Sequence, residues 1–225
     1  MEIPWVAINA ATALISQSRN KEGFESMQRA LTHSHVRKLL EERTKRSKNA
    51  RMGCSIAFDE EPKYISVAVI YLADISECAW AFLNPLFIIS PPCLHDNNVF
   101  AVCAVAAVNM GIAAHREAYA AKNCLQRRKL LQRAKLLYLR AEDLMLDEAP
   151  DLDSDESLFV VFPTLYINLV EVDMELGNFA EVDGWLRDLN DCVGCVPPWD
   201  ESYIFRHFRE ACHFYCHCRI AANAA

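Results

Sequence analysis

Apolar side chains in this chain recur every three or four residues, a spacing that places them on one face of a helix. The first segment has two such stripes, separated by the polar stretch 18–20. The first stripe consists of Ala7, Ala10, Ala11 and Leu14, and the second of Phe24, Met27, Ala30 and Leu31. Because so short a turn joins them, we expect two helices that pack antiparallel.

The same double stripe returns twice. The second pair carries Ala107, Met110, Gly111 and Ala114, followed by Ala134, Leu137, Tyr138 and Ala141. Its polar connection, residues 118–128, predicts either a helical extension or an exposed loop. The third pair carries Tyr166, Leu169, Val170 and Met174, followed by Val182, Trp185, Leu186 and Leu189. Gly177 should end its first helix, because glycine adopts a left-handed conformation at little cost.

The remaining segments complete the predicted fold. A last stripe of Phe205, Phe208, Cys212 and Tyr215 predicts a capping helix. Residues 52–98 break the helical pattern, and their β-branched and aromatic runs predict a short hairpin or an ordered insertion. We therefore predict a single all-α domain over residues 1–225, rich in helix by circular dichroism. Its elements are helix pairs at about 4–40, 101–147 and 160–190, a capping helix at 201–222, and an irregular or short β insertion at 52–98.

Composition and charge narrow the class of protein. Hydrophobic residues make up 52% of the 225 positions and charged residues 24%, which excludes wholesale disorder. No apolar run reaches the roughly 18 residues that a membrane span requires. A net charge of −7 argues against nucleic-acid binding. The start of the chain lacks a basic leader, so we expect a cytoplasmic protein with reduced cysteines. The basic run 45–51 is either a solvated loop or a nuclear localisation signal.

Mostly small residues occupy corresponding positions in the three pairs, with departures at Val170 and Leu189. They are Ala11, Gly111 and Val170 in the first helices, Gly23, Ala134 and Val182 in the second helices, and Ala30, Ala141 and Leu189 about two turns later. This pattern resembles the tetratricopeptide repeat, a helix-turn-helix unit of about 34 residues. The order of landmarks at 7–11, 109–111, 131–138, 168–169 and 175–179 also resembles uncharacterised tetratricopeptide-like proteins of microalgae. The resemblance implies a right-handed stack of antiparallel helix pairs; the alternative is a non-repeating helical bundle.

The resemblance also implies a concave groove lined by the first helix of each pair. The predicted lining is mostly apolar and consists of Trp5, Ile8, Thr12, Val105, Val108, Asn109, Ile112, Ile167, Asn168 and Glu171. We therefore expect a non-enzymatic scaffold that binds a peptide or helical segment of another protein. Asn109 and Asn168 should meet the backbone of that partner, and replacing them together with Ile112 should leave helix packing intact. In alternative interpretations, these amides bridge neighbouring helices, or the insertion at 52–98 fills the groove and the binding surface lies elsewhere.

Two other patterns suggest different chemistry. Cys192, Cys195, His213 and His217 have a spacing that suits one tetrahedral zinc ion, which makes a zinc-stabilised regulatory or redox protein the alternative function. We expect simple buried thiols instead, and no cofactor. The cations between Arg127 and Arg140 either form an exposed face, bind an acidic segment of a partner, or pair with the acidic stretch 147–156. No nucleophile lies beside an acid-base motif, so we do not expect an enzyme.

Overall fold

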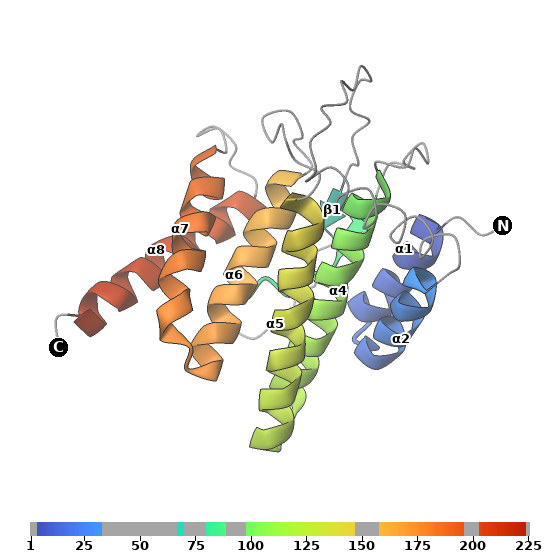
Figure 1. The fold of residues 1–225 in the computed structure, drawn as a ribbon, viewed down its shortest axis with the longest axis horizontal. Coiled ribbons are helices and arrows are strands. Elements are labelled where there is room, and N and C mark those ends of the chain that lie inside the picture. The colour runs from blue at the N-terminus through green and yellow to red at the C-terminus, as the bar shows by residue number, and fades with distance from the viewer. Residues whose placement is uncertain are drawn as a thin grey trace, which may run out of the picture.

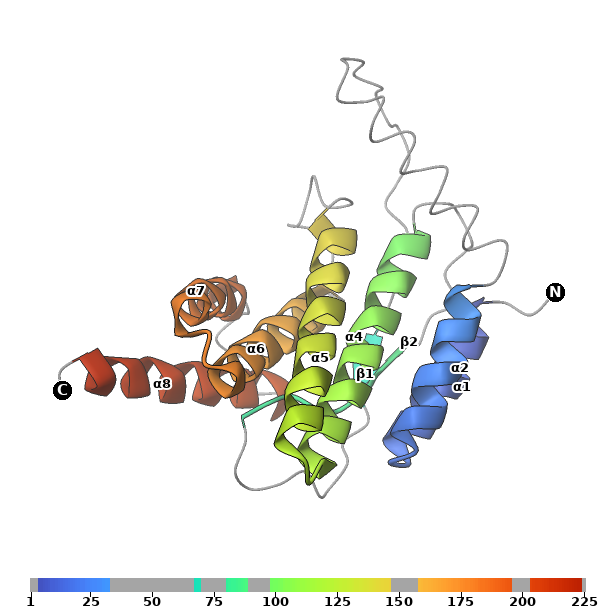
Figure 2. The same cartoon turned by 60° about the horizontal axis from the view of Figure 1, so that its bottom comes forward.

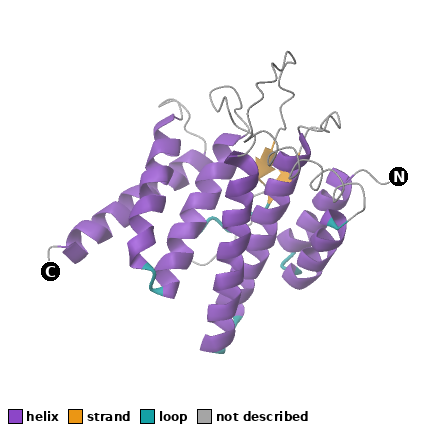
Figure 3. Ribbon diagram, viewed as in Figure 1, coloured by secondary structure: helices purple, strands orange, loops and turns teal. Residues whose placement is uncertain are grey.

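The structure, a computed structural model, describes residues 4–32, 67–69, 80–88, 98–146, 158–195 and 203–223. Helix dominates these ranges, which confirms the predicted all-α class (Figures 1 and 3). The helices are α1 (Pro4–Ser16), α2 (Asn20–Leu31), α4 (Asn98–Ala120), α5 (Cys124–Leu146), α6 (Leu158–Leu176), α7 (Phe179–Cys195) and α8 (Tyr203–Asn223). Residues 33–40, the basic run 45–51 and the acidic stretch 148–156 lie outside the described residues. None of the described helices is long and apolar enough to cross a membrane.

Helices that follow one another in the sequence pack against each other. The closest neighbours are α1 with α2, α4 with α5, and α6 with α7. Only residues 121–123 separate α4 from α5, so the helical extension is the correct interpretation of residues 118–128. Gly177 has a φ of +78°, and the N–H of Asn178 bonds to the carbonyl oxygen of Asp173 at 2.8 Å. Gly177 therefore ends α6 as predicted.

The helices form two rows. In the inner row, α1, α4, α6 and α8 contact one another in that order. The other helices lie outside this row, where α2 packs on α4, α5 on α6, and α7 on α8 (Figures 1 and 2). The insertion contributes two short strands, β1 (Val67–Val69) and β2 (Leu86–Ile88), which pair antiparallel with Ala68 opposite Phe87. Strand β2 also contacts α1 and α4, so part of the insertion packs against the inner row.

Two glycines allow the paired helices to approach closely. An ideal Cβ atom on Gly111 would lie 2.4 Å from Cε1 of Tyr138 in α5. A Cβ atom on Gly23 would lie 2.5 Å from Cγ1 of Ile15 and 2.9 Å from the carbonyl oxygen of Ala11 in α1. All three distances are too short for contacts of a carbon atom with carbon or oxygen. The helix crossings of the first two pairs therefore require glycine at these positions, which the sequence pattern had marked as small.

The buried face of α1 differs from the predicted stripe. Ala10 is exposed and Ala7 and Leu14 are half-buried, whereas Ile8 and Thr12 are buried along with Ala11. The physical reason is that α1 is covered on more than one side, because α2, α4 and β2 all pack against it. The predicted stripe of α8 is correct, since its four residues Phe205, Phe208, Cys212 and Tyr215 are all buried.

Candidate functional site

Residues 80–88 lie along the inner row and cross its four helices. Their sequence, Trp-Ala-Phe-Leu-Asn-Pro-Leu-Phe-Ile, contains no charged side chain. The segment runs against the order of the helices, so that Trp80 contacts α8 and Ile88 contacts α1. In Figure 2 its blue-green trace begins near α8 and leads past α5 and α4 to β2. The sequence-predicted groove is thus occupied by the chain itself, which is what the alternative with an internally filled groove predicts.

Three asparagines from three different helices hold the backbone of this segment. Asn168 on α6 accepts the N–H of Phe82 at 2.8 Å and donates to its carbonyl oxygen at 2.9 Å. Asn109 on α4 binds the N–H of Leu86 at 2.8 Å and its carbonyl oxygen at 2.7 Å. Asn9 on α1 binds Ile88 in the same two ways, at 3.0 and 2.7 Å. We call Asn9, Asn109 and Asn168 the amide ladder.

The contacts of the ladder follow the two-residue period of an extended chain. Phe82, Leu86 and Ile88 differ by even numbers, so their backbone polar groups face the same edge. Phe87 faces the opposite edge, where Ala68 of β1 is its partner. Pro85 also falls on the odd register, so its missing N–H removes no bond to the helices. Proline is therefore compatible with this segment at that position.

Helix α8 adds a fourth contact in the same register. Nε2 of His207 lies 3.1 Å from the carbonyl oxygen of Trp80, so a proton on that nitrogen is donated to the backbone. Burial lowers the pKa of His207, and the bond to Trp80 opposes this shift. The ring of Phe82 lies 5.1 Å from the ring of Phe208, and the ring of Trp80 lies 5.4 Å from that of Phe214. Aromatic contacts thus anchor the first residues of the segment on α8.

The predicted groove residues are largely inaccessible to an added partner. Trp5 and Glu171 are half-buried, and the others are buried, namely Ile8, Thr12, Val105, Val108, Asn109, Ile112, Ile167 and Asn168. The expectation that Asn109, Asn168 and Ile112 can be replaced without disturbing the packing is therefore wrong. A glutamate at position 112 would be a buried charge without a partner. Asn109 also donates to Oγ1 of Thr12 at 3.0 Å, so it bridges two helices as well.

Sequence reasoning missed Asn9 and His207. A signal for Asn9 was present, because each ladder asparagine lies two residues before a small-position residue of the repeat: Ala11, Gly111 and Val170. No comparable signal marks His207. Its role depends on where α8 packs, which the local sequence does not specify.

Glu171 binds two tyrosines rather than an open groove. Its carboxylate accepts the hydroxyl of Tyr119 on α4 at 3.2 Å and the hydroxyl of Tyr215 on α8. Burial raises the pKa of Glu171, and the two hydroxyl bonds oppose this shift. The residue therefore links three helices of the inner row.

The four zinc candidates are not brought together. Among the described residues, no group of three or more histidine, cysteine, aspartate or glutamate side chains is arranged to hold a metal ion. Burial raises the pKa of Cys192 to about 12, which favours the thiol over the thiolate that binds zinc. Cys195 is exposed at the end of α7, while His213 and His217 are exposed on α8. Nδ1 of His217 lies 2.7 Å from the carbonyl oxygen of His213.

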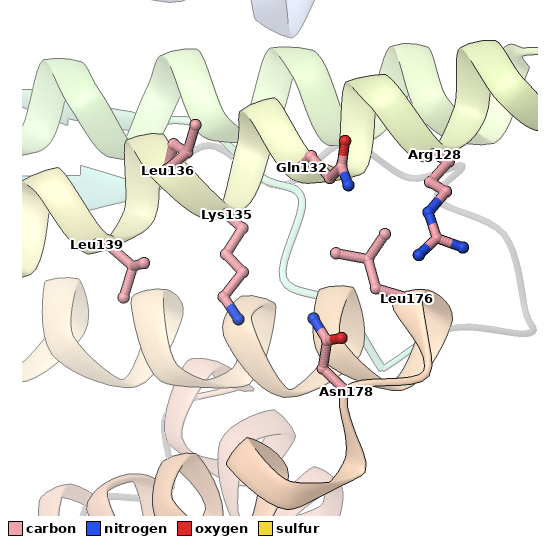
Figure 4. A pocket seen from close by; sticks show the side chains of 7 residues that line it. All are labelled: Arg128, Gln132, Lys135, Leu136, Leu139, Leu176 and Asn178. Atoms are coloured by element: carbon pink, nitrogen blue, oxygen red, sulfur yellow. The ribbon is translucent and has the colours of Figure 1, made fainter.

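The predicted basic face of α5 is partly neutralised within the chain. Arg127 pairs with Glu175 at 2.7 Å, and Lys135 pairs with Asp173 at 2.7 Å. Arg133 lies over the ring of Phe24 at 3.8 Å. A depression of about 350 Å³ remains between α5 and the end of α6 (Figure 4). It is lined by Arg128, Gln132, Lys135, Leu136, Leu139, Leu176 and Asn178.

The inner row therefore combines two means of holding an extended chain. The amide ladder binds backbone N–H and C=O groups, which every residue except proline carries. Buried apolar surface receives the side chains, as Phe82 and Leu86 show with 2% and 0% exposure. The extended chain that this arrangement holds is residues 80–88.

Comparison of the chain with protein-family models, with curated proteins and with solved structures finds no significant match.

Proposed function

We propose that this protein is a non-enzymatic scaffold of the tetratricopeptide type, which holds an extended segment of another protein along its inner row. On this proposal the three helix pairs form a right-handed stack, and α8 caps it. The close crossings at Gly23 and Gly111 support the repeat, because small residues at these positions are its signature. The row of α1, α4, α6 and α8 is then the concave side.

The observation that carries the proposal is the amide ladder. Its six hydrogen bonds recognise backbone groups rather than particular side chains. Each such bond contributes a net of about 0.5–1.5 kcal/mol, so the ladder supplies affinity for any extended segment of suitable shape that takes the place of residues 80–88. Pockets for alternate side chains then supply the specificity, as they do where a strand is added to a sheet edge.

A photocrosslinking experiment in the source cells tests the proposal. Phe214 on α8 is 44% exposed and contacts Trp80 at the end of the occupied groove, whereas Phe179 is 52% exposed at the start of α7. Benzoylphenylalanine replaces each of them in turn. We expect the probe at position 214 to give an adduct with a partner protein, mapped by mass spectrometry to one short segment of that partner.

The probe at position 179 is the matched control, since it replaces a similarly exposed phenylalanine on another helix. Adducts of equal yield from both positions, or adducts from position 179 alone, would contradict binding along the inner row. Competition by an unlabelled copy of the mapped segment should remove the adduct at position 214.

A further inference from the structure

We infer that residues 80–88 are a built-in competitor for the inner row, and that the partner segment it accepts has the same chemistry: extended, uncharged, and apolar at the positions matching Phe82, Leu86 and Ile88. The inference rests on the proposed function and specifies both the partner and its regulation.

The first argument is that the hydrogen bonds holding residues 80–88 could be made equally well to another peptide. The three ladder asparagines contact only N–H and C=O groups of the segment. A second peptide in the same register would present the same groups at the same spacing. Any chain that extends along the four helices can therefore form these backbone hydrogen bonds.

The second argument defines the side chains of the partner. Phe82, Leu86 and Ile88 are 2%, 0% and 2% exposed, so a charged or strongly polar side chain in their places would be buried without a partner. The backbone of Pro85 faces away from the ladder, so the partner can also have a proline at this position. The first residues meet Phe208 and His207 on α8, which favours aromatic side chains there.

The third argument concerns competition. The resident segment is joined to β1 by residues 70–79 and to α4 by residues 89–97, so it rebinds at the high effective concentration of a tethered ligand. A partner binds only the fraction of molecules whose inner row is free, and its apparent affinity falls by that fraction. Weakening the resident segment should thus strengthen binding of a segment added in trans.

The test uses a fluorescein-labelled synthetic peptide that copies residues 80–88, with a lysine tail for solubility. The full chain carries Phe82→Ala and Leu86→Ala, which weaken the resident segment without altering the ladder. The control chain carries Leu125→Ala and Leu136→Ala, two exposed leucines at 59% and 68% exposure. By fluorescence anisotropy, we expect the weakened chain to bind the peptide at least about tenfold more tightly than the wild type and the control chain.

Two further comparisons locate the binding. Adding Asn168→Ala to the weakened chain should reduce peptide affinity at least about tenfold, because one ladder position is lost. A peptide with aspartate in place of Phe82 and Leu86 should not bind. If the weakened chain loses helical circular dichroism, the copied peptide should restore it, whereas the aspartate peptide should not.

Two outcomes overturn the inference. One is a weakened chain that keeps its helical spectrum but binds the peptide no more tightly than the wild type. The other is a weakened chain that unfolds and is not restored by the peptide, which would make residues 80–88 a fixed part of the core. The crosslink at position 214 is recorded on the wild-type chain and uses neither variant, so failure of the proposed function is measured separately.

Discussion

At the residue scale, an asparagine side chain carries one acceptor and one donor close together, which matches the N–H and C=O of one extended residue. This explains why an amide recurs on three helices of the inner row, where an ionised carboxylate could accept the N–H but could not donate to the C=O. Asn109 and Asn168 are fully buried, so the bonds they make are shielded from water.

Replacing Asn168 with alanine should therefore lower the free energy of unfolding by about 1–3 kcal/mol, because the N–H and C=O of Phe82 lose their partners in a buried site. Gln28→Ala, at an exposed position of α2, is the control and should change it by no more than about 0.5 kcal/mol. Urea denaturation measures both. Equal effects of the two substitutions would show that the ladder does not stabilise the fold.

His115 should make stability dependent on pH. Burial, and then the nearby charge of Arg127, lower its pKa from 6.5 to about 3 in the folded chain. Between these two values the unfolded chain binds a proton that the folded chain does not. Stability is therefore intact above pH 6.5 and falls as the pH decreases towards 3, by up to about 1.4 kcal/mol per pH unit.

The comparison for this prediction is His115→Gln, measured by urea denaturation at pH 7 and pH 5. The wild type should lose about 2 kcal/mol more than the variant between these values. Burial raises the pKa of Glu171 and of Glu142, which acts with the opposite sign, but both residues are present in both proteins. Parallel losses in the two proteins would mean that His115 does not titrate as a buried group.

At the scale of the elements, the stability of each helix pair depends on how closely its two axes approach. Gly111→Leu should destabilise the protein by about 1–3 kcal/mol, because its side chain would overlap the ring of Tyr138. Gly184→Ala is the matched control inside α7, where an added Cβ meets nothing within 4 Å. That substitution should be neutral or stabilising by up to about 1 kcal/mol, since alanine favours helix. An unchanged denaturation midpoint for Gly111→Leu would contradict the packing of α4 on α5.

Three helices are also joined through the buried carboxylate of Asp173 on α6. It accepts hydrogen bonds from Lys135 on α5 at 2.7 Å, from Asn178 at 2.9 Å and from the indole of Trp185 on α7 at 2.9 Å. Asp173 is thus a polar junction between the three helices.

Asp173→Ala should therefore cost about 3–5 kcal/mol, the usual penalty for breaking a buried ion pair. The exposed pair of Arg140 with Asp143, at 3.8 Å, supplies the control. Asp143→Ala should cost no more than about 1 kcal/mol. Thermal and urea denaturation of both variants measure how much stability each one loses. Comparable losses in the two variants would contradict the role of Asp173 as a junction.

At the scale of the whole molecule, residues 80–88 join helices that are far apart in the sequence. A linear repeat array unfolds from its ends, because each unit contacts only its neighbours. Here the segment contacts α1, α4, α6 and α8 together. Opening one end should therefore weaken contacts along the whole inner row.

We expect unfolding to be a single cooperative transition. Three variants in which Trp199 is replaced, and which retain only Trp5, only Trp80 or only Trp185, report on α1, the segment and α7 by fluorescence. Their urea midpoints should coincide with one another and with the loss of helical circular dichroism. Separate midpoints for Trp5 and Trp185 would show that the helix pairs unfold independently.

The amino-acid sequence by itself determined the helices and the tight crossings between them. The three-to-four-residue spacing of apolar side chains predicted each pair, and Gly111 and Gly177 were assigned on local grounds that need no knowledge of distant contacts. The sequence also placed Asn109 and Asn168 on the face that binds extended backbone. These features follow from helical geometry, which is set within a few residues.

Only the tertiary structure decided what occupies that face. The bond between Asn9 and Ile88 joins residues 79 positions apart, and that between Phe82 and Asn168 joins residues 86 positions apart. Local patterns carry no information on such pairings. An uncharged run such as 80–88 predicts a buried strand whatever covers it. An asparagine forms hydrogen bonds with the backbone of its own chain as readily as with that of another protein. The choice between them is made by the packing of the whole chain, which also keeps the cysteines of α7 and the histidines of α8 from forming one site.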